Sequence, residues 1–317
     1  MKIVIMEPLG ISAEKLAAVT EPLKAAGHEI TAYDTKETDQ AKLLERVKDA
    51  NIIILANQPL SGDIIRQCPD LKFLSVAFTG VDHVDLAACR EKGITVCNAA
   101  GYSTNAVAEL VFGLAISVIR NILPTDDRCR HEGTKDGLVG FELSGKTFGI
   151  VGAGAIGSRV AQIAIAFGCR VIAYSRTPKP SLEALGVTFV TKDELFKEAD
   201  IVSLHTPLTP ETKFLVDEAT LRSMKPSAIL INTARGPVVD SQSLANALNQ
   251  GRLAGAGIDV FETEPPIPRD HPLLHAKHTV VTPHIAFASR EALEKRADIV
   301  VDNILNWEKG TPINLVK

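Results

Sequence analysis

The sequence has few cysteines, five in 317 residues, and no two of them are spaced as Cys-x-x-Cys. An odd number of cysteines without that spacing indicates neither a disulfide framework nor a zinc site. We therefore expect no metal site, and a reducing cytoplasm is the compartment that fits these cysteines best.

The chain also lacks a block of basic residues, and its formal net charge is -4. A nucleic-acid-binding surface requires such a block, so no nucleic-acid partner is expected. The most apolar segment, Leu110–Ile119, is far shorter than the ~20 residues that span a bilayer. The apolar run at the start, Lys2–Met6, is too short for a signal peptide and is predicted to be a strand. The expected protein is cytoplasmic, without a membrane partner.

The chain does contain a regular alternation of strand and helix patterns. A length of 317 residues, with 45% hydrophobic and 23% charged residues, is enough for two globular domains. Alternating short strands and helices imply parallel sheets covered by helices on both faces. The expected fold class is α/β, with two Rossmann-like, doubly wound parallel-sheet domains. In the first 98 residues the predicted strands are Lys2–Met6, Glu29–Tyr33, Asn51–Ala56, Leu71–Ala77 and Ile94–Cys97.

A glycine motif at residues 152–157 predicts a dinucleotide-binding turn. The motif is Gly152-Ala153-Gly154-Ala155-Ile156-Gly157, which follows the apolar run 147–151 and opens a helical pattern that ends at Gly168. The three glycines allow a tight turn, a close backbone approach to a pyrophosphate, and close packing of helix on strand. The helix N-terminus would hold the phosphates. The alternative is a glycine-rich turn without a ligand, but the strand before and the helix and strand after are the context that the motif requires.

Several polar residues follow predicted strands in the second half of the chain, at the sheet edge where ligands bind in parallel sheets. They lie in four short segments: His205, Thr206 and Pro207; Asn232, Thr233, Ala234, Arg235 and Gly236; Asp259; and Thr282, Pro283 and His284. Arg235 could bind a carboxylate through two parallel hydrogen bonds. His284 could move a proton near neutral pH, and Glu264 could hold the other ring nitrogen. Each alone is more often a surface or structural residue, and it is their position after strands that favours an active site.

A long apolar helix is predicted from about Thr104 to Ile122, ended by Pro124. Its apolar residues lie around most of its circumference, which indicates that the joined domains or a second subunit cover both faces. Residues 125–145 are predicted to be irregular, and a loop of that length is often functional or at an interface.

These motifs, in this order, resemble the D-isomer-specific 2-hydroxyacid dehydrogenase family. The matching segments are 152–157, 204–209, 231–236, 257–265 and 282–286, with further similarity at 79–85 and 98–109. The resemblance implies an NAD(P)-dependent oxidoreductase that transfers a hydride between a nicotinamide cofactor and a small 2-oxo acid or D-2-hydroxy acid, like glyoxylate or hydroxypyruvate reductases. It implies a flavodoxin-like substrate domain of residues 1–98 plus 288–317, a cofactor domain of residues 99–287, a cleft between them, and a homodimer.

The same resemblance implies a role for individual residues. The catalytic residues would be Arg235, Glu264 and His284. The substrate carboxylate would lie on Arg235 and on the loop of Phe78, Thr79 and Gly80. The cofactor would contact Thr104, Gly152, Gly154, Ala155, Ile156, Gly157, His205, Thr206, Pro207, Thr212, Thr233, Ala234, Asp259 and His284. One departure is the loop Arg130–Thr134, which has no tryptophan where family members often carry one.

The end of the second strand in the cofactor domain predicts NADP as the preferred cofactor. NAD-preferring domains carry an acidic residue there for the ribose hydroxyls, whereas this chain has Ser175, Arg176 and Thr177 and no carboxylate before Glu183. Arg176 could bind a 2′-phosphate. The alternative is that Arg176 points into solvent and that NAD is accepted equally.

Two other functions remain open at this point. One is a D-3-phosphoglycerate dehydrogenase-like enzyme, which we disfavour because Ala56–Leu60 has no arginine to hold a phosphate. The other is a dinucleotide-sensing corepressor-like binding protein, which the retained Arg235, Glu264 and His284 do not exclude. Turnover of a 2-oxo acid would distinguish the enzyme from the corepressor.

Overall fold

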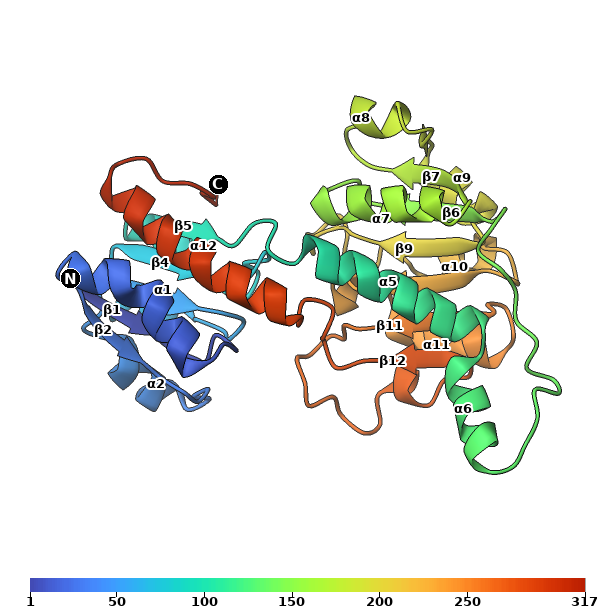
Figure 1. Cartoon of the computed structure of the whole chain (residues 1–317), viewed down its shortest axis with the longest axis horizontal. Coiled ribbons are helices and arrows are strands. Elements are labelled where there is room, and N and C mark those ends of the chain that lie inside the picture. The colour runs from blue at the N-terminus through green and yellow to red at the C-terminus, as the bar shows by residue number, and fades with distance from the viewer. Residues whose placement is uncertain (317) are drawn as a thin grey trace. The chain divides into compact units, whose positions relative to one another are not determined.

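The computed structural model describes residues 1–316 and divides into two compact units (Figure 1). The first unit is Met1–Ser103 together with the segment from Ala288 onward, and the second is Thr104–Phe287. Each unit is built on one parallel sheet, so the expected α/β class with two doubly wound domains is confirmed.

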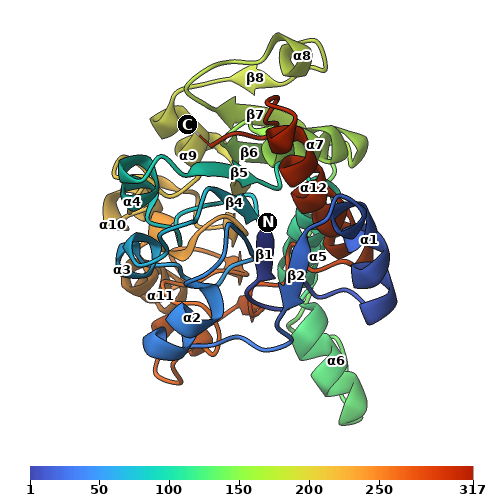
Figure 2. The same ribbon diagram turned by 90° about the vertical axis from the view of Figure 1, so that its left-hand side faces the viewer.

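The first unit contains a five-stranded sheet in the order β2-β1-β3-β4-β5. All neighbours are parallel, and Ile3 of β1 pairs with Ile30 of β2 and Ile52 of β3. Helices α1 and α12 lie on one side of the sheet, with α2, α3 and α4 on the other (Figure 2). The elements are β1 Lys2–Ile5, α1 Ala13–Ala25, β2 Glu29–Ala32, α2 Gln40–Val47, β3 Ile52–Leu55, α3 Gly62–Arg66, β4 Phe73–Val76, α4 Leu86–Glu91, β5 Thr95–Asn98 and α12 Arg290–Glu308.

The second unit contains a seven-stranded parallel sheet in the order β12-β11-β10-β9-β6-β7-β8. Its elements are α5 Thr104–Ile119, α6 Ile122–Arg130, β6 Thr147–Val151, α7 Ala155–Ala166, β7 Arg170–Tyr174, α8 Pro180–Glu183, β8 Thr188–Phe189, α9 Lys192–Glu198, β9 Ile201–Leu204, α10 Glu218–Ser223, β10 Ile229–Asn232, α11 Ser241–Asn249, β11 Gly255–Ile258 and β12 Thr279–Val281, with single 3₁₀ turns at Gly236–Val238 and Pro272–Leu274.

Alternate residues of the central strands enter two different cores. In β10, Ile229 and Ile231 pack under α5 and α7, whereas Leu230 packs with residues of α9, α10 and α11. Because successive side chains of a strand point to opposite faces, a sheet with two cores needs strands that are apolar throughout. This explains why the strands appear in the sequence as short continuous apolar runs.

The predicted apolar helix ends earlier than expected. It stops at Ile119, Asn121 adopts a left-handed backbone with a φ of 52°, and a second helix, α6, begins at Ile122 at an angle of 60°. Pro124 lies in the first turn of α6, where a missing N–H costs no helical hydrogen bond. The expectations that Pro124 ends the helix and that the chain is irregular from residue 125 were therefore wrong for residues 125–130.

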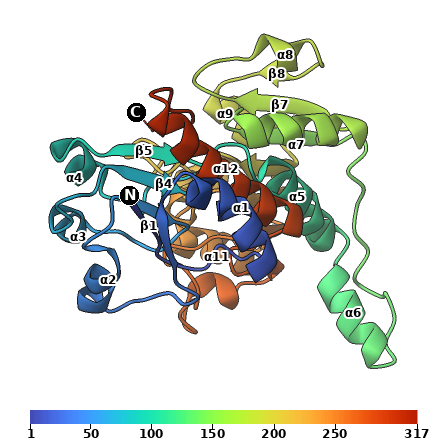
Figure 3. The same cartoon turned by 60° about the vertical axis from the view of Figure 1, so that its left-hand side comes forward.

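Helix α6 and the loop after it extend away from the sheet of the second unit (Figure 3). The side chains of Ile122, Leu123 and Val139 in this segment are 45%, 54% and 83% exposed. By contrast, seven residues of α5 are buried, and six of them belong to the core under the sheet. Among residues 1–316 no single helix is long and apolar enough to cross a membrane, although the bent pair α5–α6 reaches that limit by length and composition.

Two helices have residues that are unusual for their positions. Phe167 follows the last turn of α7, is 42% exposed and stacks on Phe112. Helix α1 continues through Pro22 to Ala25.

Candidate active site

The glycine turn between β6 and α7 has the geometry that a dinucleotide requires. Gly152 has a φ of 98°, and a Cβ there would lie 2.8 Å from the carbonyl oxygen of His205. A Cβ on Gly157 would lie 2.0 Å from the carbonyl oxygen of Gly152, so only glycine lets the helix approach the strand. Gly154, which caps α7, has open space where its Cβ would be. A phosphate can therefore approach this backbone at the helix N-terminus.

Two buried hydroxyl groups lie on neighbouring loops at the same sheet edge. Within residues 1–316, Thr206 Oγ1 after β9 and Thr233 Oγ1 after β10 are buried without a hydrogen-bond partner. An unsatisfied buried hydroxyl costs free energy, so a ligand with polar atoms is the expected partner. Together with the open space at Gly154, these groups fit a bound dinucleotide.

The end of β7 presents the residues that were expected to select the cofactor. Ser175 is half-buried, and Arg176 and Thr177 are exposed. Lys179 Nζ donates to Ser158 Oγ in the first turn of α7, at 3.1 Å. Sequence reasoning missed Lys179, because its proximity to α7 depends on the fold of the turn 175–179.

The loop after β9 is held by its own side chains. His205 Nε2 lies 2.9 Å from Ser203 Oγ, and burial lowers the pKa of His205 to about 3, so its imidazole is neutral. Thr212 Oγ1 donates to the carbonyl oxygen of Pro207 at 2.7 Å and accepts from the Thr209 N–H at 2.8 Å. Thr212 therefore fixes the shape of the loop that carries His205, Thr206 and Pro207.

Arg235 is presented by a turn that Asn232 closes. The side-chain oxygen of Asn232 accepts from the Ala234 N–H at 3.0 Å, and its amide donates to the Arg235 carbonyl oxygen at 2.9 Å. A Cβ on Gly236 would lie 2.0 Å from the backbone of Phe261, so the chain beyond Arg235 is pressed against the loop after β11. Arg235 itself is half-buried, and its Nη1 donates to the Ala234 carbonyl oxygen at 2.8 Å. Asn232 belongs to the strand-end segment that the sequence indicates, but its role in closing this turn was not predicted, since that role depends on hydrogen bonds seen only in the fold.

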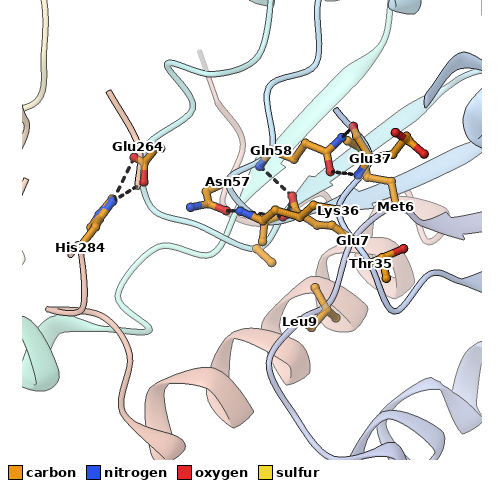
Figure 4. A network of polar contacts seen from close by, with 12 residues as sticks. Met6, Glu7, Leu9, Thr35, Lys36, Glu37, Asn57, Gln58, Glu264 and His284 are labelled. Atoms are coloured by element: carbon orange, nitrogen blue, oxygen red, sulfur yellow. Dashed lines mark hydrogen bonds and ion pairs between the residues drawn. The ribbon is translucent and has the colours of Figure 1, made fainter. Parts of the chain in front are cut away.

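His284 and Glu264 form a close pair (Figure 4). His284 Nδ1 lies 3.0 Å from Glu264 Oε1 and 2.9 Å from Oε2. The imidazole side chain is 11% exposed and the carboxylate side chain 52% exposed. Because Nδ1 faces a carboxylate, it carries a proton, and Nε2 is the nitrogen that can exchange a proton with a substrate.

The backbone of His284 is in the left-handed region, with a φ of 57°. Its N–H donates to the Asp259 carbonyl oxygen at 2.8 Å. The Asp259 carboxylate, which is fully buried, accepts from Thr282 Oγ1 at 2.6 Å and from the N–H groups of Ile285 and Ala286, both at 2.8 Å. Burial raises the pKa of Asp259, and these hydrogen bonds oppose that shift. The strained turn at His284 is thus held by Asp259.

The remaining predicted residues lie elsewhere in the fold. Phe78, Thr79 and Gly80 follow β4 in the first unit, and Thr104 is the first residue of α5 in the second. Within the second unit the glycine turn, the residues after β7, β9, β10 and β11, and His284 after β12 all lie at the carboxyl ends of one parallel sheet. The structure therefore brings the predicted cofactor residues other than Thr104, together with Arg235, Asp259 and His284, to the carboxyl-end edge of a single sheet.

The chain is similar to known proteins over its whole length. Residues 112–286 match the family model described as D-isomer specific 2-hydroxyacid dehydrogenase, NAD binding domain. A hydroxypyruvate reductase of Blautia hydrogenotrophica is 35% identical over 100% of this chain and 99% of its own. A glyoxylate reductase of Thermococcus litoralis is 40% identical over 89% of this chain and 88% of its own. Among solved structures, an acyclic imino acid reductase in complex with NADPH and D-Arg has a TM-score of 0.91 and 31% identity, covering 100% of both chains.

Proposed function

Because the chain belongs to the D-isomer specific 2-hydroxyacid dehydrogenase family, we propose that it reduces small 2-oxo acids such as glyoxylate and hydroxypyruvate, with NADPH as the preferred cofactor. The main support for this proposal is the contact of His284 Nδ1 with both carboxylate oxygens of Glu264. His284 lies at the same sheet edge as the glycine turn.

His284 would act as the general acid and base of the reaction. When bound, the nicotinamide cofactor supplies or accepts the hydride at the substrate carbon. During reduction, Nε2 of a protonated His284 would give its proton to the carbonyl oxygen, and Glu264 would stabilise the charged imidazole. During oxidation the neutral ring would take the proton from the hydroxyl group.

Arg235 would bind the substrate carboxylate and place the reacting carbon. A guanidinium can donate two parallel hydrogen bonds to a carboxylate, which fixes orientation as well as position. The turn closed by Asn232 supports this role because it fixes the backbone on either side of Arg235. In the first unit, the loop of Phe78, Thr79 and Gly80 would bind a substrate carboxylate through backbone N–H groups.

Several residues would hold the cofactor. The backbone of the glycine turn and the N-terminus of α7 would bind the pyrophosphate, and the buried hydroxyls of Thr206 and Thr233 would contact polar atoms of the cofactor. Thr104, His205, Pro207, Ala234 and the backbone of Asp259 would complete the contacts. The preference for NADPH would come from Arg176, with Ser175, Thr177 and Lys179 as further donors to the 2′-phosphate.

We propose a cytoplasmic homodimer, with helix α6 and the loop after it as part of its interface. The exposed Ile122, Leu123 and Val139 support this, because exposed apolar side chains on a projecting segment favour contact with another protein surface. Size-exclusion chromatography with light scattering tests the oligomeric state.

A steady-state assay tests the proposed function. Glyoxylate, hydroxypyruvate and pyruvate are each offered with NADPH and with NADH, without any added amine, so that a carbonyl is the only acceptor. Turnover of at least one acid at about 1 s⁻¹ or faster is expected. Cofactor binding without turnover of any of these acids would contradict the proposal and favour a dinucleotide-sensing binding protein.

A further inference from the structure

Helix α12 places a buried arginine beneath the loops of the first unit. Arg296 is 4% exposed, although the reaction proposed above does not use it. Its Nη2 donates to the Leu9 carbonyl oxygen at 2.7 Å, and its Nη1 donates to the Ala77 carbonyl oxygen at 3.3 Å. These carbonyls follow β1 and β4, which are separated in the sheet by β3. One guanidinium therefore connects two loops that share no strand pairing.

The charge of Arg296 is retained in this site. Burial lowers the pKa of Arg296, and Tyr102 and Glu7 oppose that shift. Glu7 is fully buried, and its Oε1 accepts from the N–H groups of Ala56 and Gln58, both at 2.8 Å (Figure 4). A guanidinium remains protonated at all ordinary pH values. Burial of a charge is costly compared with an apolar side chain of similar volume, so packing alone does not explain an arginine here.

The two loops that Arg296 connects include the one proposed to bind the substrate carboxylate. The Ala77 carbonyl oxygen accepts from Arg296. The next carbonyl oxygen, of Phe78, accepts from the Ala99 N–H at 3.0 Å. The Thr79 carbonyl oxygen accepts from Asn98 Nδ2 at 2.7 Å. Three consecutive carbonyls are thus fixed.

Fixing a carbonyl also fixes the next N–H. A peptide unit is planar, and its N–H points opposite to its C=O. The bonds to Ala77, Phe78 and Thr79 therefore set the directions of the N–H groups of Phe78, Thr79 and Gly80. Within residues 1–316, the N–H groups of Thr79 and Gly80 donate to no other group. These two N–H groups are therefore available to donate to a ligand.

We propose that Arg296 is a positioning residue for the substrate: by holding the Leu9 and Ala77 carbonyls, it anchors the end of β4, from which the loop with the carboxylate-binding N–H groups of Thr79 and Gly80 begins. The inference rests on the proposed function, since it assumes that this loop binds the carboxylate. Helix α12 would thus affect the affinity for the substrate and not the affinity for the cofactor.

The kinetic test compares Arg296→Met with Arg290→Met, a matched control on the same helix with an exposed side chain. For Arg296→Met we expect KM for hydroxypyruvate to rise by about 10-fold or more, with kcat changed by less than about 3-fold, because the lost interaction acts on substrate binding. The dissociation constant of NADPH should stay within about 2-fold of the wild-type value. Arg296→Lys should recover part of the KM, since an ammonium can still donate to a carbonyl. Arg290→Met should match the wild type.

A second measurement does not depend on turnover, and it separates this inference from the proposed function. Backbone ¹⁵N relaxation of Thr79 and Gly80 is recorded without substrate. In Arg296→Lys, and in Arg296→Met if it folds, the order parameters should fall from about 0.85 toward 0.6. Unchanged order parameters in a folded variant would overturn the inference. So would a loss of NADPH affinity equal to the loss of substrate affinity, because it would indicate a general structural role. Failure of the wild-type enzyme to reduce any 2-oxo acid would refute the proposed function but leave this test of the loop intact.

Discussion

Asp259 holds His284 through the backbone. The Asp259 carbonyl oxygen accepts the His284 N–H at 2.8 Å, and its carboxylate accepts the next two N–H groups of the same turn. Asp259, which accepts all three hydrogen bonds, is fully buried. The position of His284, the proposed general acid, therefore depends on Asp259, a residue that the family resemblance assigns to cofactor contact.

Replacement of Asp259 by Asn should lower both stability and kcat. The amide nitrogen that replaces one carboxylate oxygen would face the N–H of Ala286 or Ile285, and the loss of a hydrogen bond to a charged acceptor costs about 1.5–3 kcal/mol. Urea denaturation measures the free energy of unfolding, with the exposed Asp302→Asn as the control. An Asp259→Asn variant as stable and as active as the wild type would contradict this role.

Asp200 should make stability depend on pH. Its carboxylate accepts from Lys225 Nζ and from the Thr147 N–H, both at 2.8 Å. Burial alone would raise its pKa, but these partners lower it below the ordinary value. Because its pKa is lower in the folded protein, the Asp200 carboxylate stabilises the fold fully above about pH 3.9, its pKa in the unfolded chain. This stabilisation is lost as the pH falls through the pKa of the folded state. Asp200→Asn should thus be less stable than the wild type at pH 7, with a difference that shrinks below about pH 4. A difference independent of pH would refute the argument.

The cofactor preference should depend on the end of β7. The ratio of kcat/KM for NADPH to that for NADH should exceed one, because this turn offers cations and no carboxylate to the ribose. Ser175→Asp combined with Arg176→Ala should shift the ratio toward NADH by about 10-fold or more, the effect of losing a charge-assisted hydrogen bond and adding a repulsive charge. Lys179→Ala should weaken the binding of NADPH and leave the binding of NADH unchanged. A ratio below one in the wild type would refute the preference.

3-Phosphoglycerate should be a poor substrate. The structure does bring one cation to the segment after β3, since Lys36 Nζ lies 2.6 Å from Asn57 Oδ1. The same ammonium lies 3.6 Å from the buried Glu7 carboxylate, which offsets its charge. A phosphate would find no unopposed cation there, and its desolvation would be uncompensated. Oxidation of 3-phosphoglycerate with a kcat/KM equal to that for D-glycerate would contradict this.

The sequence predicts the fold and the sheet-edge residues well, because both depend on local patterns. The continuous apolar runs locate strands buried on both faces, and the polar residues after them mark the edge where Arg235 and His284 lie. The glycine motif is equally local, since the roles of Gly152, Gly154 and Gly157 follow from backbone geometry within one turn.

What the sequence does not predict depends on contacts between distant segments. Asn232 and Asp259 lie in segments that the sequence indicates, but the buried hydrogen bonds by which they shape the turns around Arg235 and His284 form only in the folded chain. Arg296 contacts Leu9 and Ala77 across more than two hundred positions, with sequence separations of 287 and 219. The break at Asn121 was missed because Pro124 is compatible with both the end of one helix and the start of another.

We propose that His284 transfers the proton in the reduction of a 2-oxo acid. Reduction of hydroxypyruvate by NADPH is measured in the wild type and in His284→Ala, with chiral analysis of the product. His275→Ala, which replaces an exposed histidine, is the matched control. We expect D-glycerate from the wild type, a kcat lower by ~10²–10⁴ in His284→Ala, and no change in the control. Formation of L-glycerate, or a His284→Ala variant with the kcat of the wild type, would contradict this proposal.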